Sequence, residues 1–177
     1  MINQAPRIET ERLILRGPRA DDHAALASIR AKEEVGKFVG GVRDSQDTWF
    51  MIMRTFGMWP MLGYGYWFID LKEAGELIGE VGFADFKRGM VPDISGIPEA
   101  GWVLDSPHWG KGLMTEAVMA AHHWLDTQTD FAKSACIISP DHTPSIRVAE
   151  KCGYVKVADS EYRGEASTVF ERQRSAT

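Results

Sequence analysis

The sequence predicts a single α/β (α+β) domain covering residues 1–177, with its ordered core between about residues 9 and 172. Three observations support this prediction. A length of 177 residues suits one domain with a substantial core. Segments of strand and helix periodicity alternate along the chain. The runs 66–71 and 76–83 are both typical of strands and are joined by the short segment KEAG, which indicates an antiparallel hairpin.

The first half of the chain contributes a strand, two helices and this hairpin. Residues 9–16 alternate apolar and polar side chains and are followed by Pro18, so we predict a strand there. Asp21 and Asp22 then open a helix. A second helix, carrying the apolar run from residue 49 to 56, is expected to begin near residues 44–47, with Ser45 or Asp47 as its cap.

The second half is organised around a short apolar run, a glycine-bearing loop and an amphipathic helix. We predict a polar loop at 87–96, a strand at 100–104, a helix after the loop at 109–114, a strand at 134–139, a helix at 143–151 and two closing strands at 154–163 and 167–172. The predicted element order is β, α, α, β, β, β, α, β, α, β, β.

Composition excludes several classes of partner. The formal net charge is -5 and the basic residues are scattered, so we expect no nucleic-acid partner. The N-terminus lacks a basic segment followed by an apolar one, and the most apolar stretch, residues 56–69, is short and rich in glycine. We therefore expect a cytoplasmic protein without a membrane partner. Cys136 and Cys152 are expected to be reduced, packed thiols.

Residues 56–68 concentrate methionine, tryptophan, tyrosine and glycine. Methionine and aromatic side chains together form an adaptable apolar surface, which would line a pocket or meet a second subunit of a homodimer. The simpler interpretation is that these side chains belong to the core, and the sequence leaves both open.

The loop from Trp109 to Met114 predicts an anion site. Gly110 and Gly112 allow the backbone to approach a phosphate closely, and the loop leads into the N-terminus of a helix, whose dipole favours negative charge. The dinucleotide-binding fingerprint would require a third glycine where Thr115 stands. A P-loop would require Gly-Lys-Ser/Thr after a longer loop, so neither pattern fits.

The segments GWVLDSPHWGKGLMTEA and SIRVAEKCGY, together with the opening ETERLILR, resemble the GCN5-related N-acetyltransferase (GNAT) superfamily. Within it they are similar to the ribosomal-protein N-terminal acetyltransferases (the RimJ/RimL-like branch). The resemblance implies a mixed, mostly antiparallel, splayed sheet flanked by helices, and an acetyltransferase that uses acetyl-CoA (coenzyme A) as cosubstrate. It also implies a primary amine as acceptor, either a protein N-terminus or a small molecule, attacked directly in a ternary complex.

The resemblance assigns cofactor-binding residues to three segments. It implies that the loop backbone holds the coenzyme A pyrophosphate, that the preceding strand pairs with pantetheine, and that two residues of a later segment contact pantetheine or the adenine side. Trp109 replaces the family's Gln or Arg, Met114 replaces a small residue, and His142 replaces an Asn. The residues concerned are Trp102, Val103, Leu104, Trp109, Gly110, Lys111, Gly112, Leu113, Met114, Thr115, His142 and Ser145.

Direct attack on a thioester requires a base for the amine and tolerance of the leaving thiolate. Glu99, at the start of the central strand, is the leading candidate base, acting through water, and Glu80 on the neighbouring hairpin is the second. Either carboxylate would otherwise be a solvated or ion-paired group. Ala149 stands where many family members have a tyrosine acid, so Ser145 is the candidate hydrogen-bond donor to sulfur.

Other chemistries receive less support. His122 and His123 point to different helix faces, and no metal site is expected. Asp141, His142 and Ser145 crowd into one turn without a nucleophile elbow, which argues against a hydrolytic triad. Two alternatives to an enzyme stay open: a non-catalytic acyl-CoA binding module, and a structural dimerisation protein that would not bind coenzyme A.

Overall fold

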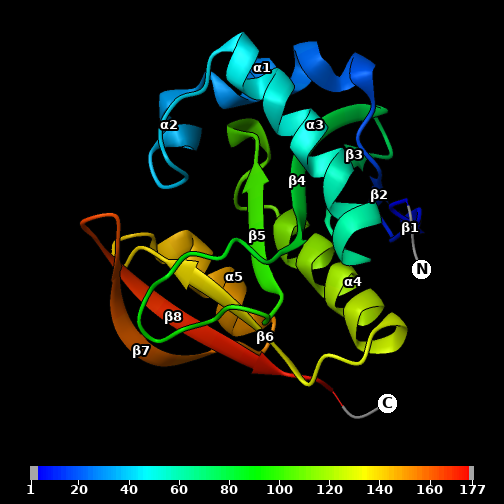
Figure 1. Ribbon diagram of the computed structural model, residues 1–177. Helices are drawn as coiled ribbons and strands as arrows, with labels where there is room; N and C mark the ends of the chain where they lie inside the picture. Colours follow the sequence, from blue (N-terminus) through cyan, green and yellow to red (C-terminus); the bar gives the residue numbers. More distant parts are fainter. Residues whose placement is uncertain (1–3, 176–177) are drawn as a thin grey trace. The chain divides into compact units, whose positions relative to one another are not determined.

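The computed structural model describes residues 4–175 and is shown in Figure 1. The strands are β1 (Ile8–Glu9), β2 (Leu13–Arg16), β3 (Tyr66–Leu71), β4 (Glu76–Ala84), β5 (Glu99–Leu104), β6 (Lys133–Ile138), β7 (Val155–Tyr162) and β8 (Glu165–Gln173). The helices are α1 (His23–Arg30), α2 (Glu33–Gly36), α3 (Ser45–Leu62), α4 (Leu113–Gln128) and α5 (Thr143–Lys151). Short 3₁₀ turns occupy Ala20–Asp22 and Ser106–His108.

The strands form one mixed sheet with the order β1-β2-β3-β4-β5-β6-β8-β7. Pairing is antiparallel between β1 and β2, β2 and β3, β3 and β4, β6 and β8, and β7 and β8. Strands β5 and β6 are parallel, with Glu99 opposite Ala135. The predicted α+β fold with a mixed, mostly antiparallel sheet and flanking helices is confirmed.

The chain's internal contacts divide it into two compact units. The first, here called unit 1, contains the chain up to Gly82 together with Trp102–Ala120. The second, unit 2, contains Phe83–Gly101 and the chain from Ala121 onward. Strands β4 and β5 and helix α4 contribute residues to both units.

In unit 1, helices α1 and α3 pack against each other, as Figure 1 shows, and against strands β3 and β4. Leu26 of α1, Ile52 of α3 and Phe68 of β3 form one buried cluster, and Leu77 of β4 packs against it. Burial of such side chains contributes roughly 1.5–3 kcal/mol each to stability. This cluster fixes both helices on the strands of unit 1.

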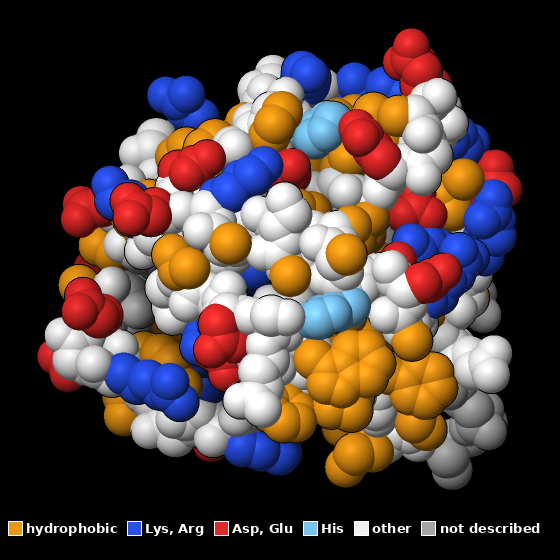
Figure 2. Space-filling view, turned by 90° about the horizontal axis from the view of Figure 1, so that it is seen from above, with side chains coloured by type: hydrophobic (Ala, Val, Ile, Leu, Met, Phe, Trp, Pro, Cys, Tyr) orange, Lys and Arg blue, Asp and Glu red, His pale blue; other side chains and the backbone are white. Residues whose placement is uncertain are grey.

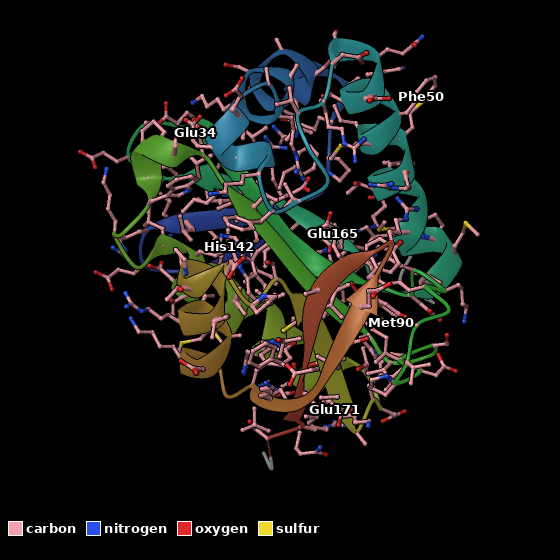
Figure 3. The ribbon with its side chains drawn as sticks, turned by 90° about the vertical axis from the view of Figure 1, so that its left-hand side faces the viewer. Glu34, Phe50, Met90, His142, Glu165 and Glu171 are labelled. Atoms are coloured by element: carbon pink, nitrogen blue, oxygen red, sulfur yellow. The ribbon has the colours of Figure 1, made fainter. Side chains whose placement is uncertain are left out.

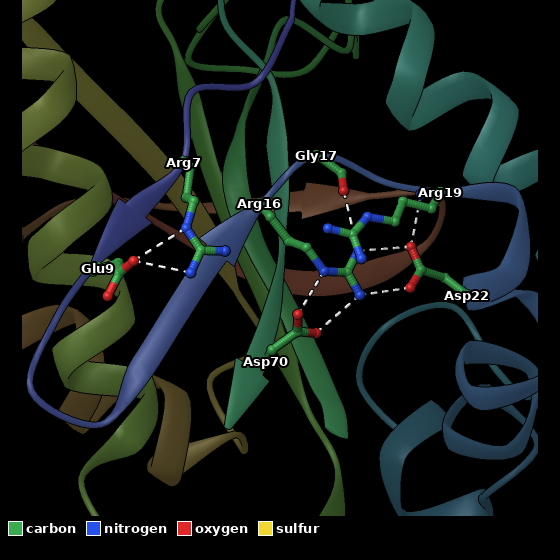
Figure 4. Close-up of polar contacts among 7 residues, drawn as sticks. All are labelled: Arg7, Glu9, Arg16, Gly17, Arg19, Asp22 and Asp70. Carbon is green, nitrogen blue, oxygen red and sulfur yellow. Dashed lines mark hydrogen bonds and ion pairs between the residues drawn. The ribbon is translucent and has the colours of Figure 1, made fainter. Parts of the chain in front are cut away.

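A buried ionic network ties β2 to its neighbours in unit 1 (Figure 4). The Arg16 guanidinium donates to both oxygens of Asp70 at 2.5 and 2.9 Å and to both oxygens of Asp22 at 2.8 and 2.6 Å. Burial acts to lower the pKa of Arg16, but the hydrogen bonds and charges of Asp22 and Asp70 together outweigh it, so the pKa is raised. Because each charge has its partners, the network is tolerated inside the fold.

Four local features differ from the sequence prediction. Residues 9–16 form two strands, because the Thr10 amide donates to the Leu13 carbonyl at 3.0 Å and the Leu13 amide donates to Thr10 Oγ1 at 3.0 Å, which closes a turn. The cap of α3 is Asp44, whose carboxylate accepts from the Asp47 amide at 2.7 Å. Helix α3 also continues through Pro60 and ends at Gly63, whose φ of 77° is left-handed. The short helix α2 was not predicted.

The residues of the aromatic segment 56–68 divide between core and surface. Trp59 is buried, with its ring 4.7 Å from that of Trp67, whereas Met61 is exposed. Trp49 packs edge-on against the His23 ring at 5.6 Å. Figure 2 shows aromatic hydrophobic side chains next to a histidine on the face seen from above. The exposed large apolar residues of α3 are Trp49, Phe50, Met53, Phe56, Met61 and Leu62.

In unit 2, the core lies between the loop after β4 and strands β6 and β8. Met90 and Ile94 of this loop pack with Ala135 of β6 and Val169 of β8. Cys136 and Cys152 are both reduced and buried, as predicted. Within residues 4–175, none of the helices combines the length and apolar character needed to cross a membrane.

Candidate active site

The loop between β5 and α4 lies in unit 1 and has the backbone shape expected of an anion site. Gly110 and Gly112 have φ values of 73° and 76°, a region that side chains disfavour. Helix α4 begins directly afterwards at Leu113. The first N–H groups of a helix have no partner within that helix, so this end offers donors and the positive end of the dipole. An added Cβ at Gly110 would meet no atom within 4 Å, so the backbone there is not covered by neighbouring side chains.

Side chains on both flanks anchor this loop to unit 1. Trp109 Nε1 donates to the Leu104 carbonyl at 2.8 Å, which ties the start of the loop to the end of β5. Leu113 and Met114 are buried, whereas Lys111 is exposed. The Met114 side chain therefore belongs to the core, which explains how a methionine is accommodated where the family motif has a small residue.

The end of β5 runs tightly beside β4 within unit 1. The Asp105 amide donates to the Ile78 carbonyl at 2.8 Å. A Cβ added at Gly79 would lie only 2.2 Å from the Val103 carbonyl oxygen. Trp102 and Val103 are half-buried and Leu104 is buried. The end of β5, which is predicted to align pantetheine, can therefore lie this close to β4 only because Gly79 has no side chain.

Glu99, the leading candidate base, lies in unit 2 and is almost completely buried. Both of its carboxylate oxygens accept from Arg88: Nε donates to them at 3.0 and 2.7 Å, and Nη2 donates to Oε1 at 2.7 Å. Burial raises the pKa of Glu99, and the ion pair with Arg88 opposes that rise. Glu99 is therefore a desolvated carboxylate with one fixed cationic partner.

Arg88 is itself held between two aromatic rings of unit 2. Its guanidinium carbon lies 4.6 Å from the Phe86 ring centroid and 4.5 Å from that of Tyr162. Cation–π contacts of this kind favour a fixed guanidinium orientation. Residues 86–90 and 161–163 line an open cavity of about 340 Å³, and Arg88 forms part of its wall. The ion pair of Glu99 is thus connected to a surface cavity.

Glu80, the second candidate, lies in unit 1 and pairs with Arg30 through its Oε1. Both side chains are buried. Among the described residues, neither Glu80 Oε2 nor Arg30 Nε has a hydrogen-bond partner. One oxygen of this carboxylate is therefore buried without a hydrogen bond from the described residues. A buried polar atom without a partner normally lowers the stability of the fold.

His142 and Ser145 are brought together at the start of α5 in unit 2. His142 precedes the helix, and its Nε2 lies 3.5 Å from Ser145 Oγ. Figure 3 labels His142 at this end of the helix. Ala149, at the position of the family's tyrosine, is buried. The helix begins at Thr143, so His142 is its N-cap residue.

The predicted site residues therefore fall into two groups. Unit 1 contains the loop, the end of β5 and Glu80, and unit 2 contains Glu99, His142 and Ser145. Sequence reasoning missed Arg88, because it lies in a segment interpreted only as a polar loop. The available signal was a cation flanked by Phe86 at a short distance before Glu99, which is weak on its own.

Comparison with known proteins gives the family. The model of the Acetyltransferase (GNAT) domain matches residues 12–155. The N-acetyltransferase p20 of Bacillus licheniformis is 29% identical over 153 residues, which cover 83% of this chain and 81% of that protein. The crystal structure of an acetyltransferase from Agrobacterium tumefaciens str. C58 has 28% sequence identity and a TM-score of 0.83, and the match covers 96% of this chain and 95% of that chain.

A further solved structure is similar in fold alone. The ribosomal L7/L12 alpha-N-protein acetyltransferase RimL, in complex with coenzyme A, has a TM-score of 0.77 at 16% identity, covering 95% of this chain and 98% of that chain. Because the family model spans most of the sequence, the chain belongs to the GNAT acetyltransferase family. It is an N-acetyltransferase, so the predicted family and enzyme class are confirmed.

Proposed function

We propose that this enzyme transfers an acetyl group from acetyl-CoA to a primary amine by direct attack in a ternary complex. The observation that carries the proposal is the loop of unit 1, where two left-handed glycines lead into the N-terminus of α4. Such a backbone suits a diphosphate, because amide donors and a helix dipole converge without intervening side chains. RimL, a structural neighbour, has been solved with coenzyme A.

In this proposal the residues have separate tasks. The loop amides from Gly110 to Met114 hold the diphosphate, and the backbone of Trp102–Leu104 aligns the pantetheine. His142 contacts the cofactor, and Ser145 Oγ donates a hydrogen bond to the sulfur. Acetyl-CoA supplies an activated acyl group whose thiol has a low pKa, near that of cysteine, so departure as thiolate requires little acid assistance. Ala149 in place of a tyrosine is compatible with that chemistry.

Glu99 is the proposed base, acting through water on the attacking amine. The nitrogen forms a bond to the acetyl carbon, the carbon–sulfur bond breaks, and the amine proton passes to the carboxylate. Burial raises the pKa of Glu99, which makes the carboxylate a stronger base near neutral pH. Its partner Arg88 lines the cavity of unit 2, and we propose this cavity as the entry for the acceptor.

The acceptor class favoured by this arrangement is an α-amine. At pH 7 an α-amino group with a pKa of about 8 is roughly one-tenth neutral, whereas a lysine amine with a pKa of about 10.4 is neutral in fewer than one molecule per thousand. A single carboxylate acting through water is better suited to the α-amine, because a larger fraction of that amine is already neutral. A peptide N-terminus and a small α-amino compound both satisfy this requirement.

A thiol-release assay tests the function directly. Acetyl-CoA is incubated with peptides that have free N-termini, with amino acids and with polyamines, and free thiol is measured. We expect turnover with at least one α-amine. If acetyl-CoA binds but no amine is acetylated, the non-catalytic binding module is favoured. If calorimetry detects no binding of acetyl-CoA, the proposed cofactor loop is wrong.

The role of Glu99 is tested with Glu99→Gln at two pH values. We expect turnover of an α-amine to fall by about tenfold or more at pH 7, because a general base contributes typically 10²–10⁴-fold. The loss should be much smaller at pH 9, where most of the amine is already neutral. Asp126→Asn is the matched control, since it removes the charge of another buried carboxylate of unit 2 that is paired with an arginine, Arg172. A loss with Glu99→Gln that is independent of pH would instead indicate acceptor binding.

A further inference from the structure

The turn between β1 and β2, part of the opening motif ETERLILR, contacts the first turn of α4 within unit 1. Glu116 Oε1 accepts from Thr10 Oγ1 at 2.6 Å and from the Arg12 amide at 2.9 Å. Glu116 Oε2 accepts from Arg12 Nε at 2.7 Å. The turn is more than one hundred residues before Glu116 in the sequence, so these contacts are a tertiary arrangement that no local pattern predicts.

The same arginine also contacts the glycine loop itself. Arg12 Nη1 donates to the Lys111 carbonyl at 2.9 Å. Its Nη2 atom lies 3.6 Å from the position that a Cβ of Gly112 would occupy. One guanidinium therefore links the carbonyl between the two glycines to the first turn of the helix. With this carbonyl committed to Arg12, the orientation of the neighbouring peptide groups is restricted.

Charge gives this contact a second consequence. Glu116 is the fourth residue of α4, and a carboxylate near this end would repel a bound anion. Its pKa is lowered: partial burial opposes the shift, but hydrogen bonds from Thr10 and Arg12 outweigh it, so Glu116 is ionised at neutral pH. Arg12 supplies the compensating positive charge directly at the carboxylate.

We propose that Arg12 is a positioning residue for cofactor binding. It fixes the Trp109–Leu113 loop through the Lys111 carbonyl and neutralises Glu116, so that the loop presents its amides to a diphosphate without a competing negative charge. The inference rests on the proposed function, in which this loop holds the diphosphate of acetyl-CoA. Thr10 Oγ1 also donates to Glu116 Oε1, which helps to hold the carboxylate against Arg12.

Calorimetric titration with acetyl-CoA tests the effect on affinity. Arg12→Ala should weaken binding by about tenfold or more, because it removes two charge-assisted contacts and exposes the charge of Glu116. Adding Glu116→Gln to Arg12→Ala should recover part of the loss by removing the repulsion. Arg12→Lys keeps the charge without the guanidinium geometry and should be intermediate. Arg7→Ala is the matched control, since Arg7 is an exposed arginine near the same turn and pairs with the exposed Glu9.

Backbone ¹⁵N relaxation of the unliganded protein tests the positioning role separately. N–H groups at the start of a helix lack an intrahelical partner, so their motion reports whether the loop is ordered. We expect lower order parameters for residues 110–115 in Arg12→Ala than in the wild type, and unchanged ones in Arg7→Ala. Arg12→Ala with unchanged affinity, or with unchanged order parameters in the loop, would overturn the proposal. A wild-type protein that fails to bind acetyl-CoA would contradict the proposed function instead, and the relaxation data would still decide whether Arg12 orders the loop.

Discussion

The imidazole of His122 in α4 lies between the rings of Phe83 and Tyr154 in unit 2, at centroid distances of 5.1 and 5.3 Å. Neither ring nitrogen has a hydrogen-bond partner among the described residues. Burial, with a smaller effect from Arg172, lowers the pKa of His122 to about 3. This histidine behaves as a neutral aromatic side chain, and a polar group without a partner at this depth costs stability.

His122→Phe should make the protein less sensitive to acid. Above pH 6.5 the imidazole is neutral in the folded and unfolded states. Between pH 6.5 and about pH 3 the unfolded state binds a proton that the folded state does not, so the free energy of unfolding falls through this window. The loss from His122 is about 2 kcal/mol between pH 7 and pH 5. Phenylalanine preserves the ring contacts and removes this contribution.

Urea unfolding at pH 7 and pH 5 measures the difference. Acidification also removes stability contributed by carboxylates whose pKa is lowered, such as Glu116, but these groups are present in both proteins and cancel in the comparison. The free energy of unfolding should therefore decline less in His122→Phe than in the wild type. Equal declines in the two proteins would show that His122 is not kept neutral by the fold.

The sequence pointed to some candidate site residues and not to the residues that pair with them. Glu99 was predicted to be the base from its position at the start of the central strand; it is buried there and paired with Arg88, and its catalytic role stays a prediction. Its partner Arg88 was not identified, because the loop that contains it has no periodicity. The loop's conformation, with Lys87 at a φ of 50°, depends on tertiary contacts. The same holds for Arg12, whose partner Glu116 lies in another element.

Strand β4 depends on glycine for its close packing in unit 1. A Cβ at Gly79 would lie 2.2 Å from the Val103 carbonyl oxygen and 3.1 Å from the Leu104 Cα. A Cβ at Gly82 would lie 2.3 Å from the Tyr66 Cα. Both obstacles are backbone atoms, which cannot rotate away as a flexible side chain can. The spacing between β4 and its neighbours is therefore set by the missing side chains.

Gly79→Ala should destabilise the protein by about 1–3 kcal/mol, the usual cost of overpacking a core. The added methyl would have to displace the end of β5, so weaker binding of acetyl-CoA is also expected if that strand aligns the cofactor. Gly57→Ala is the matched control in α3, where an added Cβ meets nothing within 4 Å.

Replacing this helical glycine by alanine should stabilise the protein by about 0.5–1 kcal/mol. Thermal unfolding of both variants beside the wild type provides the measurement. A Gly79→Ala protein as stable as the wild type would show that β5 can move without cost.

Elements with clear periodicity were predicted well. The β3–β4 hairpin, α1, α4, α5 and the two closing strands all form where the pattern placed them, with boundaries differing by a few residues. The pattern was wrong where hydrogen bonds override it, as at Thr10, whose side chain closes a turn inside an apparent strand. It was also incomplete at Pro60, because α3 continues through this residue for part of a turn.

For the molecule as a whole, the fold and family were predictable and the grouping of the site was not. Periods of two and 3.6 residues describe local structure only. The assignment of distant segments to one function came from the resemblance of three motifs in order, and the family model covering residues 12–155 supports it. The candidate residues are divided between the two compact units. Local periodicity does not predict this division.

A ligand that binds only the folded state stabilises the whole protein, and this provides a test of the cofactor loop. Acetyl-CoA at one hundred times its dissociation constant should add about 2.7 kcal/mol to the free energy of unfolding. For a protein of this size that corresponds to a rise in the unfolding midpoint of roughly 5–11 °C. Gly112→Asp should abolish the rise, because it adds a negative charge to the loop beside Arg12, competes with Glu116 for that guanidinium and strains the backbone at a φ of 76°.

The matched control for this variant is Gly75→Asp in the β3–β4 turn of the same unit. Gly75 also has a left-handed φ, 66°, and an added Cβ there meets nothing within 4 Å, so the substitution adds the same charge and a similar strain. Gly75→Asp should keep the full rise with acetyl-CoA even if its own midpoint is lower. A Gly112→Asp protein that is still stabilised by acetyl-CoA would mean that the diphosphate binds elsewhere, because a carboxylate within the loop cannot coexist with a bound diphosphate at undiminished affinity.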